Sequence, residues 1–198
     1  MQNMAFSSAA DRNRIPIIEQ LKQRLPVKGT VLEIGSGTGQ HAVFFADELP
    51  GVIWQPSDRQ ENIADLVAGF AQVGNRRILP PLRLDVLLDA WPEQKFEASY
   101  SANTAHIMSW QAVIAMFGGV SECLHESALF CLYGPFNIDG QFTSDSNRQF
   151  DLQLRARDAQ MGIRDMGDIE TLARENRLVL QQKIAMPANN FLLVFKKS

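Results

Sequence analysis

The stretch Val31-Leu32-Glu33-Ile34-Gly35-Ser36-Gly37-Thr38-Gly39 decides the fold of this chain. An apolar strand leads into it, three glycines occupy alternate positions, and a helical pattern follows. A backbone that turns this sharply and approaches a ligand closely needs residues without a Cβ. The stretch is therefore typical of the nucleotide-binding turn of a Rossmann-like sheet.

The class of nucleotide depends on Glu33, which stands two residues before the first glycine. A dinucleotide places its diphosphate against such a turn, beside the positive end of the next helix. A carboxylate here would repel that diphosphate and would suit a cationic cofactor such as S-adenosylmethionine, which carries an ammonium and a sulfonium. The dinucleotide fingerprint also requires a glycine at position 40, where this chain has Gln40.

Composition favours one ordinary globular domain. The chain has 198 residues, of which 45% are hydrophobic and 21% charged. Its net charge of −3 gives no field that attracts nucleic acid or an acidic membrane. Cys123 and Cys131 form neither a disulfide framework nor a zinc pattern, and neither a secretory start nor a membrane-spanning run is apparent. We expect a cytoplasmic protein without metal, nucleic-acid or membrane partners.

Strand and helix patterns alternate along the chain, which predicts an α/β fold: a doubly wound, mostly parallel sheet of seven strands with helices on both faces. Only residues 186–190 separate the last two strands, too few for a parallel crossover, so the seventh strand should be antiparallel. We expect one domain over residues 1–198, with a helical lid at 1–25 and an insertion at 134–165 after strand five. Strands are expected near residues 30–34, 52–56, 82–84, 98–102, 128–133, 179–185 and 191–195, and helices near 11–25, after 39, and near 62–73, 110–124, 147–158 and 168–176. The first helix should bury a stripe of Ile15, Ile18, Leu21 and Leu25, and the second should bury Val43, Phe44 and Leu49. The interleaved arginines and aspartates of the insertion indicate a solvated surface.

The carboxyl ends of the strands carry the candidate cofactor contacts, because ligands of open α/β sheets bind there. Asp58 can accept hydrogen bonds from ribose hydroxyls, and Asp85 from an adenine amino group beside the Val86 N–H. The Asn103 carbonyl can hold an ammonium. Alternatively, Asp58 caps a helix and Asp85 stabilises a turn. The candidate cofactor-binding residues are Glu33, Gly35, Ser36, Gly37, Gly39, Asp58, Asp85, Val86, Asn103 and Arg12, the last of which reaches either the cofactor carboxylate or an acidic substrate.

A transferase of this kind needs at most a base near the acceptor, and His106 after strand four is the best candidate. It can equally be a packing residue. His41 is explained by its helix position, and His125 precedes strand five at the end away from the cofactor. The candidate substrate-pocket residues are Trp110, whose alternative is a helix anchor, and Tyr133, Asn137 and Asn189, where the asparagines can also be turn residues.

At these positions the chain resembles the class I S-adenosylmethionine-dependent methyltransferases. Val31–Gly39 looks like their first motif, Asp58 like their second-strand acid, and Asp85-Val86 like their adenine contact. One departure is Glu97 where many of them have an aspartate in strand four. The flanking segments Phe6–Asn13, Gly39–Ala42, Leu132–Asn137 and Met186–Asn190 resemble the uncharacterised family of methyltransferase-like protein 26. This resemblance implies the fold and the cofactor but no substrate.

Three functions follow from these observations. The first is a methyltransferase for a small molecule, since little of the chain lies outside the core fold and no basic stripe with interleaved aromatics is present. The second is an NAD-dependent oxidoreductase, against which Glu33, Gln40 and the antiparallel last strand argue. The third is a non-catalytic protein that binds the cofactor or a partner, because methyl transfer has no obligatory catalytic side chain.

Overall fold

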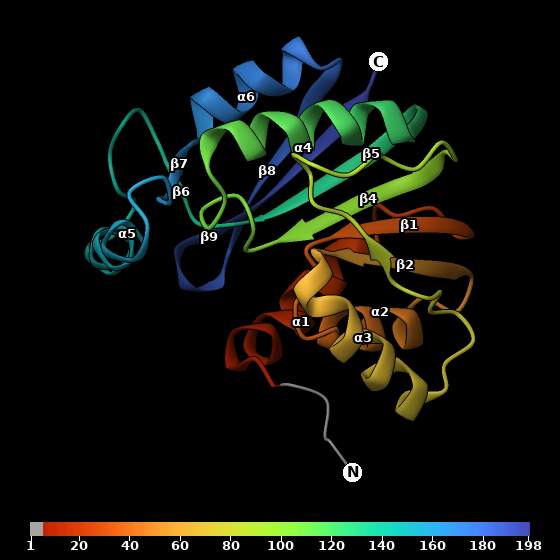
Figure 1. The fold of residues 1–198 in the computed structure, drawn as a ribbon. Coiled ribbons are helices and arrows are strands. Elements are labelled where there is room, and N and C mark those ends of the chain that lie inside the picture. Colours follow the sequence, from red (N-terminus) through yellow and green to blue (C-terminus); the bar gives the residue numbers. More distant parts are fainter. Residues whose placement is uncertain (1–5) are drawn as a thin grey trace.

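A central seven-stranded sheet organises the molecule (Figure 1). The computed structural model describes residues 6–198. The spatial order of the strands is β3-β2-β1-β4-β5-β9-β8, so the chain changes direction across the sheet between β1 and β4. The strands are β1 (Gly29–Ile34), β2 (Val52–Asp58), β3 (Leu82–Arg83), β4 (Phe96–Ala102), β5 (Leu124–Gly134), β8 (Leu178–Met186) and β9 (Asn190–Lys197).

The expected mostly parallel sheet is confirmed. Strands β3, β2, β1, β4 and β5 pair in parallel, whereas β9 pairs antiparallel with both β5 and β8. The reversal at β9 follows from its short connection to β8, the 3₁₀ turn Pro187–Asn189. In this turn Ala188 and Asn189 take φ values of 58° and 56°. Left-handed backbone of this kind reverses the chain within few residues.

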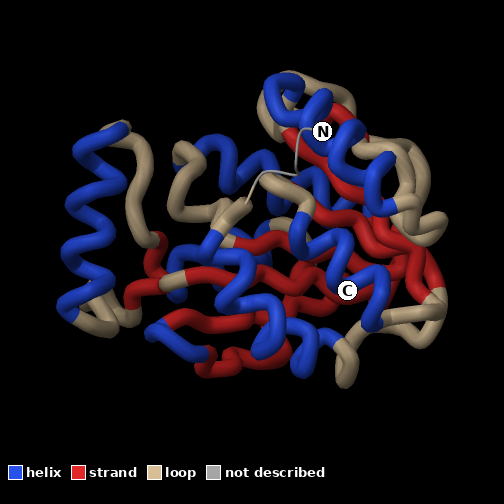
Figure 2. Tube along the Cα trace, turned by 90° about the horizontal axis from the view of Figure 1, so that it is seen from below, coloured by secondary structure: helices blue, strands red, loops and turns tan. Residues whose placement is uncertain are grey.

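Helices cover both faces of the sheet (Figures 1 and 2). The helices α4 (Trp110–Cys123) and α6 (Met166–Glu175) lie on one face. The other face carries α1 (Ser8–Leu21), α2 (Gln40–Glu48) and α3 (Gln60–Val73). Helix α5 (Asp145–Arg157) stands apart, beyond the carboxyl ends of the strands.

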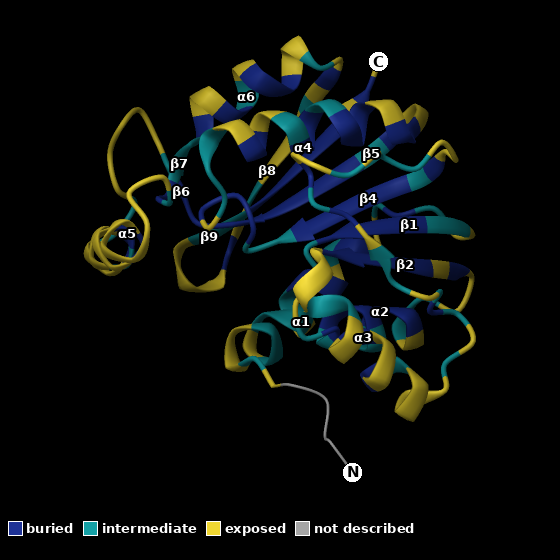
Figure 3. Ribbon diagram, viewed as in Figure 1, coloured by how far each residue is buried: buried dark blue, intermediate teal, exposed yellow. Residues whose placement is uncertain are grey.

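Two clusters of buried residues form the core of the molecule. Figure 3 shows that the central strands consist mostly of buried residues. On the α4 and α6 side, Phe117, Phe130 and Phe195 pack with ring centroids 5.4–6.0 Å apart. On the other side, Phe45 contacts both Trp54 and Tyr100 at 5.5 Å. Because both faces are covered, most residues of β1, β2 and β4 are buried.

Helix α1 begins earlier than expected, and α2 buries a different face from the one expected. Helix α1 begins at Ser8 rather than near residue 11, because the Ser7 hydroxyl caps the Ala10 N–H at 3.3 Å. Its expected apolar stripe is buried at Ile18, Leu21 and Leu25, whereas Ile15 is 49% exposed and Ile17 is fully buried. Helix α2 was expected to bury Val43, Phe44 and Leu49, but these are only partly buried, and the helix turns His41, Ala42, Phe45 and Ala46 into the core instead.

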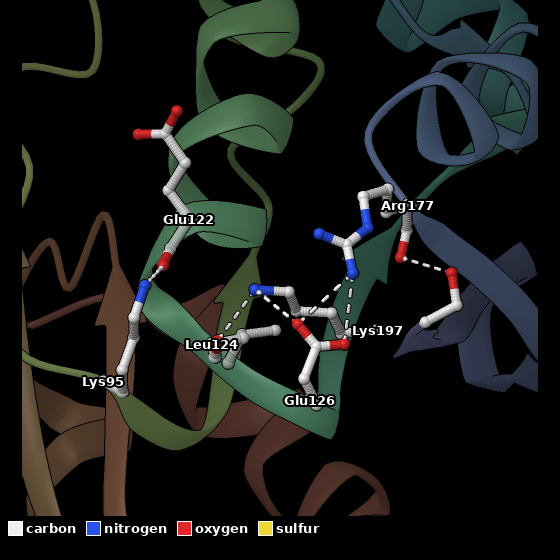
Figure 4. Close-up of polar contacts among 7 residues, drawn as sticks. Lys95, Glu122, Leu124, Glu126, Arg177 and Lys197 are labelled. Atoms are coloured by element: carbon white, nitrogen blue, oxygen red, sulfur yellow. Dashed lines mark hydrogen bonds and ion pairs between the residues drawn. The ribbon is translucent and has the colours of Figure 1, made fainter.

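Strand β5 begins earlier than residue 128, because α4 continues into it without a loop. Cations hold this junction together (Figure 4). The buried Lys197 ammonium donates to the Leu124 carbonyl at 3.0 Å and pairs with Glu126 at 3.5 Å, and Lys95 donates to the Glu122 carbonyl. Positive charge at the last carbonyls of a helix is stabilising. His125 lies here in β5, with 3.7 Å between its Nε2 and the Glu97 carboxylate.

The segment between β5 and α6 contains a two-stranded parallel sheet that the sequence did not predict, β6 (Phe136–Asn137) with β7 (Arg164–Asp165). Its mixed charges were expected to be solvated, which is wrong for two residues. Asp151 is buried and accepts from the Ile163 N–H and the Arg155 guanidinium, both at 2.7 Å. Arg164 donates to the carbonyls of Ala105 and Met108. These bonds fasten α5 to the end of β4.

We expect Gly119→Ala to lower the free energy of unfolding by about 1–3 kcal/mol, because a Cβ there would lie 1.9 Å from the Trp91 indole. Gly118→Ala in the same helix is the matched control, since its Cβ would lie 3.5 Å from the nearest atom. That control should be neutral or gain about 0.5–1 kcal/mol from helix propensity. Urea denaturation measures both, and equal stabilities would contradict the expectation.

Candidate functional site

A cavity of about 590 Å³ opens at the carboxyl ends of β1 and β4. Its floor is the glycine turn that follows β1. Its walls come from the start of α1, from α5 and from the turn between β8 and β9. The lining residues are Ser7, Ala9, Ala10, Arg12, Glu33, Gly35, Ser36, Gly37, Thr38, His41, Ala102, Asn103, His106, Pro135, Ser146, Asn147, Phe150, Ala188 and Asn190.

The glycine turn is fixed by contacts beneath it. Gly35 has a φ of 72°, and a Cβ there would lie 2.6 Å from the Thr104 side chain. The Thr104 hydroxyl is in turn 2.7 Å from the hydroxyl of Ser101, which donates to the Ile34 carbonyl. Gly37 is different, because a Cβ added there would face open space, and the residue lines the cavity. A ligand can therefore approach the backbone closely at Gly37.

Most amide groups of this turn already have acceptors within the protein. The N–H groups of Gly35 and Ser36 both donate to the Ser57 carbonyl at 3.0 Å. The Gly37 N–H donates to the Asp58 carboxylate at 2.6 Å. A diphosphate held at a helix start relies on such amides as donors. The amides of Gly35, Ser36 and Gly37 are thus not free to donate to a diphosphate.

The Glu33 carboxyl lies under this turn and is 2% exposed. It accepts hydrogen bonds from the Ser36 hydroxyl at 2.8 Å and from the Trp54 indole at 3.0 Å. Burial raises its pKa from 4.5 to about 7, against the two hydrogen bonds, and the nearby Asp58 charge adds to the rise. A positively charged ligand in the cavity would favour the ionised carboxylate.

The two strand-end aspartates have internal roles. Both oxygens of buried Asp58 are engaged, one with the Gly37 N–H and the other with the Arg59 N–H and the Asn62 amide. Asp85 accepts from the Leu87 N–H at 3.0 Å and so stabilises its own turn. Val86 is part of the core. None of the three is among the cavity-lining residues, and their cofactor contacts remain predictions, as does a contact to Gly39.

Asn103 occupies the expected place at the end of β4. Its φ of 59° is left-handed, which is costly for most residues and tolerated by asparagine. The Asn103 N–H donates to the Tyr133 carbonyl at 2.9 Å, which holds the bend. Backbone held in this conformation concentrates at ligand sites. The residue lines the cavity, as predicted for a cofactor contact.

His106 lies on the cavity wall and is 5% exposed. Its ring contacts Phe150 edge-on, with centroids 5.3 Å apart. Burial and the positive charge of Arg164 lower its pKa from 6.5 to about 4, so the imidazole is neutral at physiological pH. The predicted base is therefore in the cavity and in the form that accepts a proton. Whether it acts as a base stays a prediction.

The predicted substrate residues are dispersed. Trp110 begins α4, packs against the core and lies under the Arg164 guanidinium at 5.9 Å. Asn137 lies in β6, with its side-chain oxygen buried and unbonded in the described part of the chain, and Asn189 binds Asn147 through its carbonyl at 3.1 Å. These three do not line the cavity, and Tyr133 lines a second one beside it.

The sequence missed how the start of α1 is fastened over the cavity. His41 donates from Nε2 to the Asn13 side-chain oxygen at 2.7 Å, and its Nδ1 accepts from the Tyr100 hydroxyl at 3.2 Å. The Gln40 side chain accepts from the Ser7 N–H. Gln40 and His41 directly follow the last glycine, which was the available signal for such a role. Residues 1–5 of the expected lid at 1–25 lie outside the described residues.

The cavity-lining residues of α5 were also missed: Ser146, Asn147 and Phe150. Their helix is amphipathic only in part, and nothing in its sequence shows that it faces the glycine turn.

Among residues 6–198, no cluster of three or more His, Cys, Asp or Glu residues forms a potential metal site. Within the same residues, no helix combines the length and apolarity needed to cross a bilayer.

We expect Glu33→Gln to remove a pH dependence of stability. Because the folded pKa of Glu33 is raised from 4.5 to about 7, the folded state binds more protons between these pH values. The Glu33 carboxyl therefore lowers the free energy of unfolding of the wild type by up to about 3 kcal/mol as pH rises through that window. This decrease is complete above pH 7. Urea titrations at pH 5 and 8 measure the difference between variants. Exposed Glu175→Gln should follow the wild type, and parallel curves for all three proteins would refute the assignment.

Solved methyltransferase structures share the fold. An O-methyltransferase family protein from Burkholderia thailandensis matches with a TM-score of 0.81 at 14% identity, over 96% of this chain and 57% of that one. The mitomycin 7-O-methyltransferase MmcR matches with 0.81 at 13% identity, over 96% and 55%. CalO1, a methyltransferase in calicheamicin biosynthesis solved with S-adenosylhomocysteine bound, matches with 0.75 at 18% identity, over 96% and 54%. The chain thus spans little more than half the length of these enzymes.

The model of one sequence family matches residues 4–197, nearly the whole chain. The chain belongs to the family described as "Protein of unknown function (DUF938)".

Proposed function

We propose that this protein is an S-adenosylmethionine-dependent methyltransferase acting on a small-molecule acceptor. The observation that carries the proposal is the buried Glu33 carboxyl beneath a turn whose amides are already bonded. This arrangement favours a cationic ligand and disfavours an anionic diphosphate. Methyltransferase structures with the same fold, one of them with S-adenosylhomocysteine bound, support it.

The cavity residues suit the amino-acid end of this cofactor. Glu33 and the Asn103 carbonyl are acceptors for an ammonium, and the open face at Gly37 leaves room for close approach. Asp58 would contact ribose hydroxyls while it holds the Gly37 amide, and Asp85 and Val86 would lie beside adenine. When bound, S-adenosylmethionine supplies a methyl group on a positively charged sulfur, whose departure leaves the neutral thioether S-adenosylhomocysteine.

His106 is the proposed proton acceptor. Its imidazole forms no hydrogen bond within the described part of the chain, so a ring nitrogen is available to an acceptor hydroxyl, amine or acid. The Arg164 charge that lowers its pKa also favours release of the proton after transfer. Phe150 and the start of α1 line the same space.

Two alternatives remain weaker. An NAD-dependent oxidoreductase conflicts with the bonded amides of Gly35–Gly37 and with Glu33. A non-catalytic cofactor-binding protein would share the same cavity, and only turnover distinguishes it. We also propose that the protein is related to the family of methyltransferase-like protein 26 and that it lies in the cytoplasm.

Calorimetric titration tests the cofactor. We expect S-adenosylhomocysteine to bind, with an affinity that falls about tenfold from pH 8 to pH 6 as Glu33 takes up a proton. Glu33→Gln should bind more weakly and without this pH dependence, whereas Glu175→Gln should match the wild type. NAD should not bind. Binding of NAD with no binding of S-adenosylhomocysteine would end the proposal.

Methyl transfer tests the role of His106. With isotope-labelled cofactor and a metabolite extract as the acceptor source, His106→Asn should reduce labelling at least about 100-fold, the usual contribution of a general base. Its affinity for S-adenosylhomocysteine should stay within twofold of wild type. His125→Asn, on the exposed part of β5, is the control and should label normally. Labelling by His106→Asn at near wild-type rate would remove the base from the mechanism.

A further inference from the structure

A second cavity of about 390 Å³ adjoins the first. Five residues border both cavities, which therefore adjoin at the end of β4: Ala9, Arg12, Asn103, Ala188 and Asn190. The glycine turn does not reach the second cavity, whose remaining wall comes from α1, β5 and the turn before β9. Its lining residues are Ala9, Arg12, Asn13, Pro16, Asn103, Tyr133, Pro187, Ala188 and Asn190.

The charge of this second cavity is positive and uncompensated. Arg12 supplies a guanidinium, and no carboxylate is among the lining residues. The nearby Asp11 carboxylate pairs with Arg14 at 3.2 Å instead, and Arg14 lies over the Phe44 ring. Arg12 itself forms no ion pair within the described residues. An arginine so placed can bind an anion through two parallel hydrogen bonds.

A second donor of this cavity is the Tyr133 hydroxyl. Burial raises the pKa of Tyr133 above its ordinary value of 10, against the influence of the neighbouring Asn13 and Asn190 side chains. Tyr133 is therefore protonated at neutral pH, and its hydroxyl can donate to a ligand in the second cavity.

We propose that the second cavity binds a carboxylate of the methyl acceptor, with Arg12 and Tyr133 as the two donors. This inference rests on the proposed methyltransferase function and narrows its substrate class to small carboxylic acids. A single guanidinium matches a monoanion better than a phosphate dianion. The apolar side chains of Ala9, Pro16 and Pro187 accommodate the carbon skeleton next to the charged group.

The test uses benzoate and its uncharged isostere benzamide, titrated by ligand-observed NMR into the full chain with and without S-adenosylhomocysteine. We expect benzoate to bind at least tenfold more tightly than benzamide. Arg12→Gln should weaken benzoate at least tenfold and Tyr133→Phe about threefold or more. Both variants should bind S-adenosylhomocysteine within twofold of wild type. Arg157→Gln, an exposed arginine on α5 outside both cavities, is the matched control.

Equal binding of benzoate and benzamide, no binding of benzoate, or full benzoate binding by Arg12→Gln would each overturn the proposal. A tenfold loss of S-adenosylhomocysteine affinity in Arg12→Gln would also overturn it, by assigning Arg12 to the cofactor carboxylate. Circular dichroism establishes that each variant is folded. Failure of the wild type to bind S-adenosylhomocysteine refutes the proposed function instead, and the titration without it still reports on the carboxylate subsite.

Discussion

The candidate site depends on a buried acid at the end of β1. Glu33 lies between the Trp54 indole and the Ser36 hydroxyl, and these two donors hold its carboxyl directly under the glycine turn. The turn above it is tied to β2 through the Ser57 carbonyl and the Asp58 carboxylate. Trp54, Ser57 and Asp58 all belong to β2, so this neighbouring strand positions both the acid and the turn above it. The floor of the site therefore carries a carboxyl group that is close to its pKa at neutral pH and so is partly ionised.

The walls of the cavity come from parts of the chain that are distant in sequence but joined by specific polar contacts. Gln40 and His41 attach the start of α1 to the helix after the glycine turn. Asn147 attaches α5 to the turn before β9, and Asp151 and Arg164 attach it to the end of β4. The sheet provides the floor, and these contacts determine the shape of the space above it.

The sequence predicted the architecture well, because glycine spacing, apolar strands and one short final connection are local signals. Glu33, Asn103 and His106, which it singled out, line the cavity, and their roles there stay predictions. The sequence could not show that Asp58 holds the Gly37 amide or that Asp151 is buried, since both depend on partners from other segments. The start of α1 was placed three residues too late, because the capping role of Ser7 was not recognised. The lining by α5 was missed for the same reason: its partners lie elsewhere in the chain.

Gln40 stands in the position where a dinucleotide fold has its third glycine, and its side chain has a structural role. It accepts from the backbone N–H of Ser7, so the start of α1, which lines the cavity, is bonded to the start of α2. A glycine at this position would lack that acceptor. The residue that completes a dinucleotide fingerprint would therefore leave this wall of the cavity unattached at Ser7.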